Sequence, residues 1–339
     1  MKRLLPLVLI GLFACTLPVG VGQILQPTAL PTPISTTTPD QNFSTAPQGE
    51  LGTDKNPMVL ALAPSSTQPE PSVLAAGKTL TALLEKSTGY KFISVVPPTE
   101  TDLVKAFGDK NAQIGLLSPA GYLLASGQGY VEAAFVRQLS RNVFYGAQFI
   151  ARSDAGFVSY YDPIKDENLA DATAALAQFK DKKPCWTDEK SLSGYIVPLG
   201  FLNDADVQVL APAFVTSHPT VVRAVYAGGI CDFGATYNDA RAYSGLEDQY
   251  PDVMKKVVVI WRIPPIIPYD TLAIAHGINE DQRRTLIRAF VDIMSTDDGK
   301  SAMQTLYGFD AMQVVQDSQY EDFRNAVKAS GLDLTTLVK

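Results

Sequence analysis

Two hydroxyl side chains and a glycine stand together in the stretch Asp188-Glu189-Lys190-Ser191-Leu192-Ser193-Gly194-Tyr195-Ile196-Val197-Pro198. A short apolar segment that is typical of a strand, 184–186, precedes the stretch, and the apolar segment 195–202 is typical of a helix. The first amides of a helix have no acceptors within it, and the helix dipole places partial positive charge there. The serines therefore either cap this helix or help to bind an anion at its start.

The composition limits what else the protein can be. The chain has 339 residues, of which 46% are hydrophobic, so it can bury a sizeable core in two globular units. Its net charge is −7 and it has no cluster of Lys and Arg, so we expect no binding to nucleic acid. With two histidines and three cysteines there is little material for a metal site, and we expect no metal and no cofactor.

The N-terminus is typical of an export signal. Lys2 and Arg3 precede an apolar run, 4–13, which is shorter than the roughly 20 residues that a membrane span needs. The run ends in Leu12-Phe13-Ala14-Cys15, which resembles a bacterial lipobox whose cysteine, Cys15, receives the lipid. An ordinary signal peptide cleaved nearby is the alternative. After this segment, 1–15, the residues 16–56 are rich in Pro, Thr, Ser and Gln and are expected to form a flexible tether.

Strands and helices alternate in the remaining sequence. The expected strands are 57–63, 91–96, 112–117, 131–139, 144–151, 184–186, 209–214, 230–235, 257–261 and 266–274. The expected helices are 72–86, 99–107, one that opens at 118–120, 167–179, 195–202, 219–227, 280–294, 299–307 and 320–330. This order predicts two α/β lobes, 57–151 plus 256–339 and 152–255, with the chain crossing between them near 151 and 256. Such a clamshell binds its ligand at the carboxyl ends of the strands.

Four stretches, in this order, carry a resemblance to a known family. They are Asn111-Ala112-Gln113-Ile114-Gly115-Leu116-Leu117-Ser118-Pro119-Ala120-Gly121-Tyr122, then Asp188 to Pro198, then Thr216-Ser217-His218 with Val221 to Val225 and Cys231-Asp232, and then Ile263-Pro264-Pro265-Ile266-Ile267-Pro268-Tyr269-Asp270. The sequence from 57 to 332 resembles the phosphate/phosphite/phosphonate-type substrate-binding proteins of ABC transporters. The resemblance implies the two-lobed type II periplasmic-binding-protein fold, with mixed sheets flanked by helices, and a solute receptor rather than an enzyme.

The resemblance also implies a set of ligand-binding residues. The family's Ser-Thr-Ser run corresponds to Ser191, Leu192 and Ser193, so Leu192 removes one hydroxyl but keeps its amide. The other expected ligand residues are Gly194, His218, Tyr122, Ser65, Ser66, Tyr237, Asp239 and Asp270. The serines and His218 would bind an oxyanion, and Asp239 and Asp270 would face the rest of the ligand, for example an amine. Each has a structural alternative: Tyr122 as a core aromatic, His218 as a helix cap, and Asp270 as a turn residue.

The remaining cysteines, Cys185 and Cys231, are expected on strands of the same lobe. Exported proteins meet an oxidising compartment, so the two can form a disulfide that would brace the anion site. Two buried free thiols are the alternative.

The expected partners are a small oxyanion, an ABC permease in the membrane and a lipid anchor, with the protein a monomer on the outer side of the membrane in the cell envelope. Two other functions remain open. A ligand-sensing lipoprotein coupled to a membrane partner would have the same sequence features. An extracellular hydrolase is less favoured, because no G-x-S-x-G elbow, P-loop or metal motif accompanies the serines.

Overall fold

The structure is a computed structural model of the chain, and it describes residues 50–63, 69–309 and 311–338. Cys15, Ser65 and Ser66 lie outside the described residues, so their expected roles stay predictions. Within the described part, no helix combines the length and the hydropathy that a membrane crossing requires. The same residues contain no group of three or more His, Cys, Asp or Glu that could hold a metal ion.

The first sheet contains six of the described strands in the order β13-β4-β12-β3-β1-β2. Their bounds are β1 Met58–Ala61, β2 Phe92–Val95, β3 Ile114–Leu117, β4 Val131–Arg137, β12 Thr271–Ala275 and β13 Met312–Val314. Strand β1 pairs in parallel with β2 and β3, and β12 pairs antiparallel with β3 and β4. All residues of β3 and β12 are buried, as expected for central strands that helices cover on both faces.

The second sheet contains five described strands in the order β11-β5-β10-β8-β9. Their bounds are β5 Phe144–Arg152, β8 Pro184–Trp186, β9 Ala213–Phe214, β10 Phe233–Tyr237 and β11 Val257–Pro268. Strands β8, β9 and β10 are parallel, whereas β5 runs antiparallel to both β10 and β11. A separate small hairpin pairs β6 Tyr161–Asp162 with β7 Glu167–Asn168.

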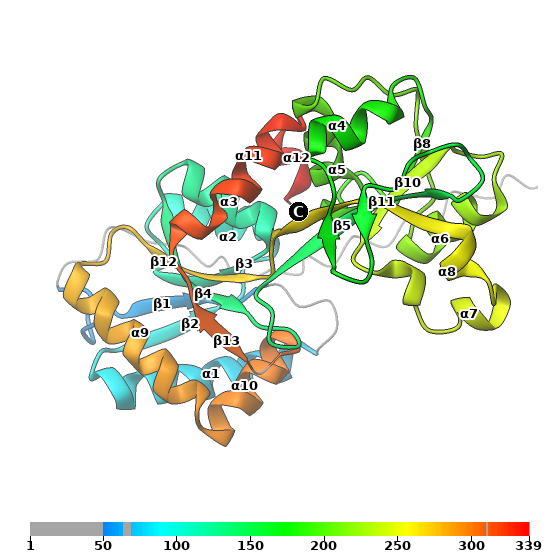
Figure 1. Ribbon diagram of the computed structural model, residues 1–339. Helices are drawn as coiled ribbons and strands as arrows, with labels where there is room; N and C mark the ends of the chain where they lie inside the picture. The colour runs from blue at the N-terminus through cyan, green and yellow to red at the C-terminus, as the bar shows by residue number, and fades with distance from the viewer. Residues whose placement is uncertain (1–49, 64–68, 310, 339) are drawn as a thin grey trace, which may run out of the picture. The chain divides into compact units, whose positions relative to one another are not determined.

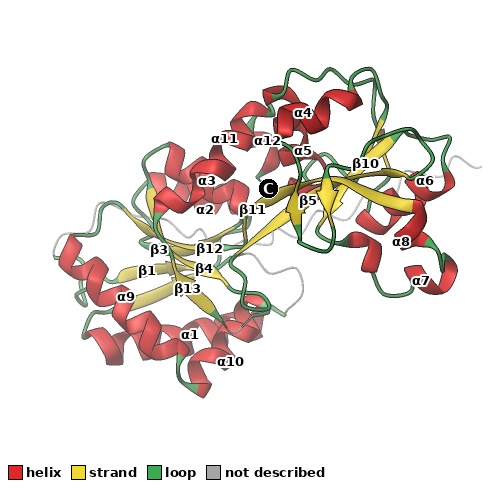
Figure 2. Ribbon diagram, viewed as in Figure 1, coloured by secondary structure: helices red, strands yellow, loops and turns green. Residues whose placement is uncertain are grey.

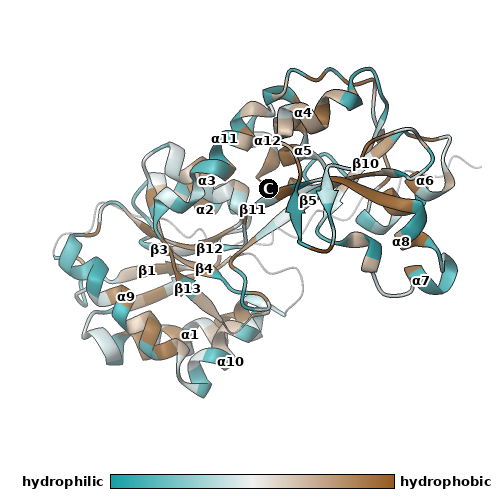
Figure 3. Cartoon of the chain, in the orientation of Figure 1, coloured by the Kyte–Doolittle hydropathy of each residue, from teal (hydrophilic) through white to brown (hydrophobic). Residues whose placement is uncertain are grey.

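Helices cover both faces of each sheet (Figures 1 and 2). The helices on the first sheet are α1 Glu70–Thr88, α9 Glu280–Met294 and α10 Asp297–Tyr307 on one face, with α2 Glu100–Gly108 and α3 Pro119–Gly127 on the other. The second sheet carries α4 Ala172–Leu176 and α5 Val197–Asp204 on one face and α6 His218–Ala227, α7 Leu246–Gln249 and α8 Val253–Lys256 on the other. We call these two groups the first lobe and the second lobe. In Figure 3 the hydropathy colours mark β1 as hydrophobic and much of α7 as hydrophilic.

Side-chain caps start several helices where the sequence predicts them. The Thr99 hydroxyl accepts a hydrogen bond from the Asp102 amide at 3.1 Å, and the Ser118 hydroxyl accepts one from the Gly121 amide at 3.1 Å. The Ser217 hydroxyl likewise accepts from the Thr220 amide at the start of α6. Each cap satisfies an amide that has no acceptor inside the helix, which explains why the predicted starts agree with the structure to within about one or two residues.

The division of the chain between the lobes differs from the prediction. Strands β5 and β11 were expected to lie in, or to lead back to, the first lobe, but both pair within the second sheet. The chain therefore passes between the sheets at 138–143 and at 269–270, not near 151 and 256. Antiparallel pairing of β5 with β10 and β11 decides this, and strand patterning alone cannot reveal which strands pair.

Three local expectations are also wrong. The helix expected over 167–179 is the strand β7 followed by the short α4 and the 3₁₀ turn η1 Ala177–Phe179. The strand expected over 209–214 is reduced to β9. The tether expected to reach 56 ends earlier, since the Leu51 carbonyl accepts a hydrogen bond from Gln282 Nε2 and the Gly52 carbonyl accepts one from the Lys91 amide.

The last helices connect the lobes a third time. Helix α11, Glu321–Ala329, packs on α5 of the second lobe, whereas α12, Leu334–Leu337, packs on α3 of the first lobe. A Cβ atom on Gly200 would collide with the Ala326 carbonyl oxygen, so a glycine is needed for α5 and α11 to pack this closely. The side chain of Asn203 also donates a hydrogen bond to the Ala329 carbonyl at 2.9 Å.

Candidate functional site

One edge of the second sheet collects most of the residues that the sequence singles out. The parallel strands β8, β9 and β10 all end at this edge, so the loops 187–194 and 215–218 lie there together with Tyr237, the last residue of β10. Strand β5 starts at the same edge and β11 ends at it, because Ala147 of β5 pairs both with Tyr237 at the end of β10 and with Ile263 of β11. Carboxyl ends of parallel strands are where ligands bind in α/β proteins.

The segment after β8 forms a helix start with two unused amides. Ser191 caps the π-helical turn η2, Leu192–Ile196, and its hydroxyl accepts a hydrogen bond from the Gly194 amide at 3.1 Å. The turn η2 continues directly into α5, so 192–204 is one helical segment. Within the described residues, the amides of Leu192 and Ser193 have no hydrogen-bond acceptor. Ser191 is thus both a helix cap and part of a place where amides can bind an anion.

Ser193 lies beside Tyr145, near the start of β5. Its side chain is 4% exposed and lies near enough to the Tyr145 phenol to oppose the rise that burial causes in the pKa of Tyr145, which reaches about 12. The Tyr145 ring stacks on Tyr269 with ring centroids 5.0 Å apart. Tyr145 was not among the residues predicted from the sequence, although it lies at the start of β5, beside the expected ligand loops.

His218 is the first residue of α6, and its two ring nitrogens have different roles. Its Nδ1 atom accepts a hydrogen bond from the Tyr237 amide at 3.2 Å, so in the neutral ring the proton is on Nε2. Burial lowers the pKa of His218 to about 4, and the nearby Asp188 carboxylate works against that change. The histidine is therefore neutral at pH 7 and offers an Nε2–H donor, while the Tyr237 ring meets it edge to face at 4.6 Å.

A carboxylate occupies the start of α3 in the first lobe. Glu100 Oε1 accepts a hydrogen bond from the Ser118 amide at 2.5 Å, and Oε2 accepts one from the Ser118 hydroxyl at 2.9 Å. Gly121 leaves room for it, since a Cβ atom there would collide with Oε1. Burial raises the pKa of Glu100, the bonds from Ser118 lower it, and the nearby Asp270 carboxylate raises it further. The sequence analysis took Glu100 for part of a helix start and missed this contact.

Tyr122 lies in the core, which favours the alternative interpretation over a contact with the ligand. Its ring is 0% exposed and packs on Tyr320 with centroids 4.5 Å apart. Its hydroxyl donates to the Asp317 carboxylate and accepts from the Ala133 amide, and burial raises the pKa of Tyr122 well above its usual value. Tyr122 is the core aromatic of the alternative interpretation, and it joins α3 to the C-terminal segment.

Asp239 already pairs with residues of the second lobe, which disfavours its expected contact with an amine on the ligand. Its carboxylate accepts from Arg241 Nε at 3.0 Å and NH2 at 2.6 Å, and from Gln148 Nε2 at 2.8 Å. Burial raises its pKa, but the bonds and charge of Arg241 outweigh burial and leave the pKa of Asp239 lowered. A carboxylate with these partners has little capacity left for a ligand.

Asp270 lies at the end of the second crossing segment, 269–270, and its carboxylate is less tightly paired than that of Asp239. Its ion pair with Arg137 is long, at 3.5 Å, and about a third of its side chain is exposed. Burial raises the pKa of Asp270, and the charge of Arg137 lowers it in part. Asp270 and Glu100 therefore place two carboxylates of raised pKa near each other, and Asp270 is also near Tyr145.

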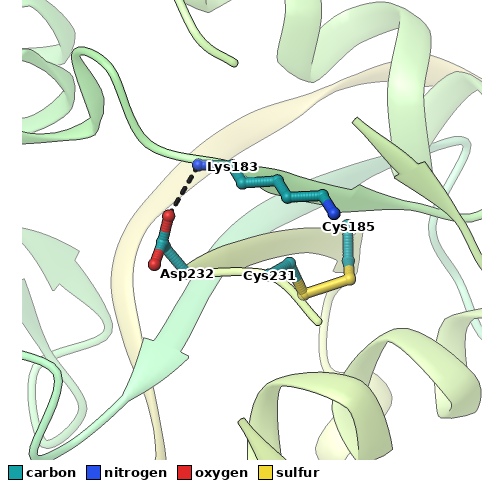
Figure 4. The surroundings of a disulfide bond; sticks show 4 residues. All are labelled: Lys183, Cys185, Cys231 and Asp232. Carbon is teal, nitrogen blue, oxygen red and sulfur yellow. Dashed lines mark hydrogen bonds between the residues drawn. A yellow bond between two sulfur atoms is a disulfide. The ribbon is translucent and has the colours of Figure 1, made fainter. Parts of the chain in front are cut away.

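A disulfide lies beneath α6 (Figure 4). The Cys185 and Cys231 sulfurs are bonded, with Cα atoms 5.6 Å apart, and both residues pack with Val221, Val222 and Val225 of α6. Cys231 precedes β10 instead of lying on it, and the Lys183 amide donates to Asp232 beside it at 2.7 Å. The bond ties the strand before the serine loop to the strand that ends at Tyr237.

Comparison with known proteins identifies the class to which this fold and site belong. Residues 62–320 match the family described as "ABC transporter, phosphonate, periplasmic substrate-binding protein". The chain belongs to this family of substrate-binding proteins, which work with ABC permeases and are not enzymes. The fold is the type II periplasmic-binding-protein fold that the sequence predicts. No curated protein matches the sequence.

Solved structures share the fold at low sequence identity. XAC2383 from Xanthomonas citri, bound to ATP, aligns with a TM-score of 0.54 and 14% identity over 81% of this chain and 96% of that one. The same protein bound to chloride ion gives 0.53 and 14% over 81% and 97%. A binding protein component of an ABC phosphonate transporter from Pseudomonas aeruginosa gives 0.44 and 18% over 81% and 87%.

Proposed function

We propose that this substrate-binding protein takes up a phosphonate-, phosphite- or phosphate-like oxyanion at the edge where β8, β9 and β10 end, between its two lobes. The observation that carries the proposal is the helix start at 192–193, where two amides have no acceptor in the part of the chain that the structure describes. The hydroxyls of Ser191 and Ser193 and the Nε2–H donor of His218 complete a set of donors around it. Family membership supports the ligand class, and the donors support the position.

Local donors must do this work, because the net charge of the chain is −7 and its overall field repels anions. Hydrogen bonds to a charged oxygen contribute roughly 1.5–3 kcal/mol each, so four or five of them suffice for micromolar binding after the costs of association. Leu192 contributes its amide alone.

The other end of the ligand meets the acidic first lobe. Asp270 and Glu100 supply acceptors there, whereas Asp239 is paired with Arg241. A ligand with a hydrogen-bond donor or an amine opposite its oxyanion, such as an aminoalkylphosphonate, fits this arrangement better than a bare oxyanion. A second anionic group would be repelled and would leave a buried like-charge pair.

Closure of the lobes over the ligand would signal its presence to a permease. The crossing segments 138–143 and 269–270 would act as hinges, and α11 would move with the second lobe on which it packs. A lipid on Cys15 would hold the protein at the outer face of the membrane, with the residues before 50 as its tether.

Calorimetry with phosphate, phosphite, an alkylphosphonate and an aminoalkylphosphonate tests the proposed function. We expect saturable 1:1 binding of at least one of them, with the aminoalkylphosphonate the tightest. Scattering at saturation should then give a smaller radius of gyration than the ligand-free protein. Absence of binding for all four compounds, with the protein folded, contradicts the oxyanion site. A radius of gyration that does not change contradicts the closure of the lobes but leaves the oxyanion site standing.

A further inference from the structure

Thr187 carries a buried hydroxyl that no described residue contacts by a hydrogen bond. It directly follows β8 and is 1% exposed. Its Oγ1 atom is buried and has no hydrogen-bond partner among the described residues. A buried unpaired hydroxyl costs free energy that a valine of the same shape would not, so a threonine here needs a reason.

The position of this hydroxyl supplies the reason. A Cβ atom on Gly194 would collide with Thr187 Oγ1 and would lie 2.8 Å from Ser191 Oγ, so both oxygens flank the first turn of the helical segment 192–204. The unused amides of Leu192 and Ser193 belong to the same turn. Gly194 thus keeps the Thr187 oxygen next to the donors of the proposed oxyanion site.

The backbone of Thr187 is held on both sides. Its amide donates to the Gly194 carbonyl at 3.3 Å, and its carbonyl accepts from the Thr216 amide at 2.7 Å. Thr216 has φ +71°, a left-handed conformation that is unusual for threonine, and it precedes the helix start at His218 by two residues. Thr187 therefore connects the serine loop to the histidine loop, and its side chain is fixed relative to both.

We propose that the Thr187 hydroxyl donates a hydrogen bond to the bound oxyanion and supplies the third hydroxyl that Leu192 cannot provide. This role rests on the proposed function, since it needs an oxyanion at the start of the segment 192–204. The ligand satisfies the hydroxyl when bound, and the ligand-free protein bears the cost of leaving it unpaired.

The test replaces the hydroxyl without changing the shape of the side chain. In the full chain, Thr187→Val should weaken binding of methylphosphonate, phosphite and phosphate by about tenfold or more, which corresponds to about 1.4 kcal/mol. The same substitution should raise the Tm of the ligand-free protein, because it removes an unpaired polar group. Thr187→Ser keeps the hydroxyl and should bind within about threefold of wild type. Adding Leu192→Thr to Thr187→Val should recover part of the affinity.

The outcomes separate the two proposals. Wild-type protein that binds none of the three probes overturns the oxyanion site and this role with it. Wild-type protein that binds a probe, with Thr187→Val binding equally well, overturns the role of Thr187 and leaves the proposed function standing. A Thr187→Val protein that loses both affinity and stability also overturns it, because the hydroxyl would then be structural.

Discussion

The Nδ1 atom of His218 accepts a hydrogen bond from the Tyr237 amide at 3.2 Å, across the gap between α6 and the end of β10. This bond settles which nitrogen of the neutral ring carries the proton, and it points the Nε2–H group away from the strand. The histidine is therefore held as a neutral donor by a backbone amide instead of by a carboxylate. A protonated ring would have to give up the bond from Tyr237, since both nitrogens would then be donors.

This arrangement predicts a loss of stability in mild acid. Burial lowers the pKa of His218 to about 4, below its value of 6.5 in the unfolded chain, so the unfolded chain binds a proton first. The contribution of the neutral ring is complete above pH 6.5 and is lost as the pH falls towards 4. Urea unfolding between pH 7.5 and 4 should show a steeper fall for wild type than for His218→Gln. His276→Gln controls for the substitution, and equal slopes for wild type and His218→Gln contradict the prediction.

Removing both serine hydroxyls should weaken the proposed oxyanion site. Ser191→Ala with Ser193→Ala is expected to reduce affinity by at least about tenfold, or about 1.4 kcal/mol, measured by calorimetry. The Ser191 change also removes a helix cap, which costs stability of about 1 kcal/mol. Thr296→Ala removes the cap of α10 far along the chain and should cost similar stability with unchanged affinity. Equal affinity in the double variant would place the anion elsewhere.

The sequence predicted the α/β class and most elements because caps and apolar periodicity are local signals. Ser118 and Ser217 mark helix starts through a hydrogen bond three residues away, which a reader of the sequence can anticipate. The lobe boundaries were wrong because the pairing of β5 with β11 joins segments about a hundred residues apart, and neither strand records its partner.

The same distinction between local and distant signals explains which residues of the candidate site could be predicted from the sequence. Ser191 and Ser193 could be proposed as a pair from the sequence because their loop is contiguous. Asp239 could not be assigned, since its use depends on Arg241 and on Gln148 from another strand. The core position of Tyr122 could not be predicted for the same reason, because its partner Asp317 is 195 residues away. Residues that gain their role from distant partners need the fold before they can be interpreted.

Because Cys185 and Cys231 form a disulfide, their thiols should react with an alkylating reagent only after reduction. Mass analysis after alkylation should show two additional modified thiols only when the unfolded protein has been reduced. Replacing both cysteines by serine should lower the free energy of unfolding by about 2–5 kcal/mol. Cys15→Ser is the control and should leave the count of reducible thiols unchanged. Two thiols that react without reductant would show that the pair is free.

The charge of Glu100 should lower the affinity of the first lobe for an anion. Its carboxylate already binds the Ser118 amide and hydroxyl at the start of α3, where a ligand oxyanion could otherwise bind, and Asp270 lies near it. Glu100→Gln keeps an acceptor for the Ser118 amide but removes the charge. We therefore expect affinity for bare phosphate to rise several-fold and the preference for an aminoalkylphosphonate over an alkylphosphonate to fall by a similar factor.

The charge of Glu100 can be separated from its contribution to the fold. Asp102→Asn removes a carboxylate from the same helix, where it accepts a hydrogen bond from the Thr99 hydroxyl, and should leave both ligand affinities unchanged. Burial raises the pKa of Glu100, so wild type should approach the preference of Glu100→Gln as the pH falls towards that pKa, whereas the variant should change less. Competition calorimetry at pH 5 and pH 8 measures both effects. A preference that is the same in wild type and Glu100→Gln at both pH values would mean that the carboxylate caps α3 and has no part in choosing the ligand.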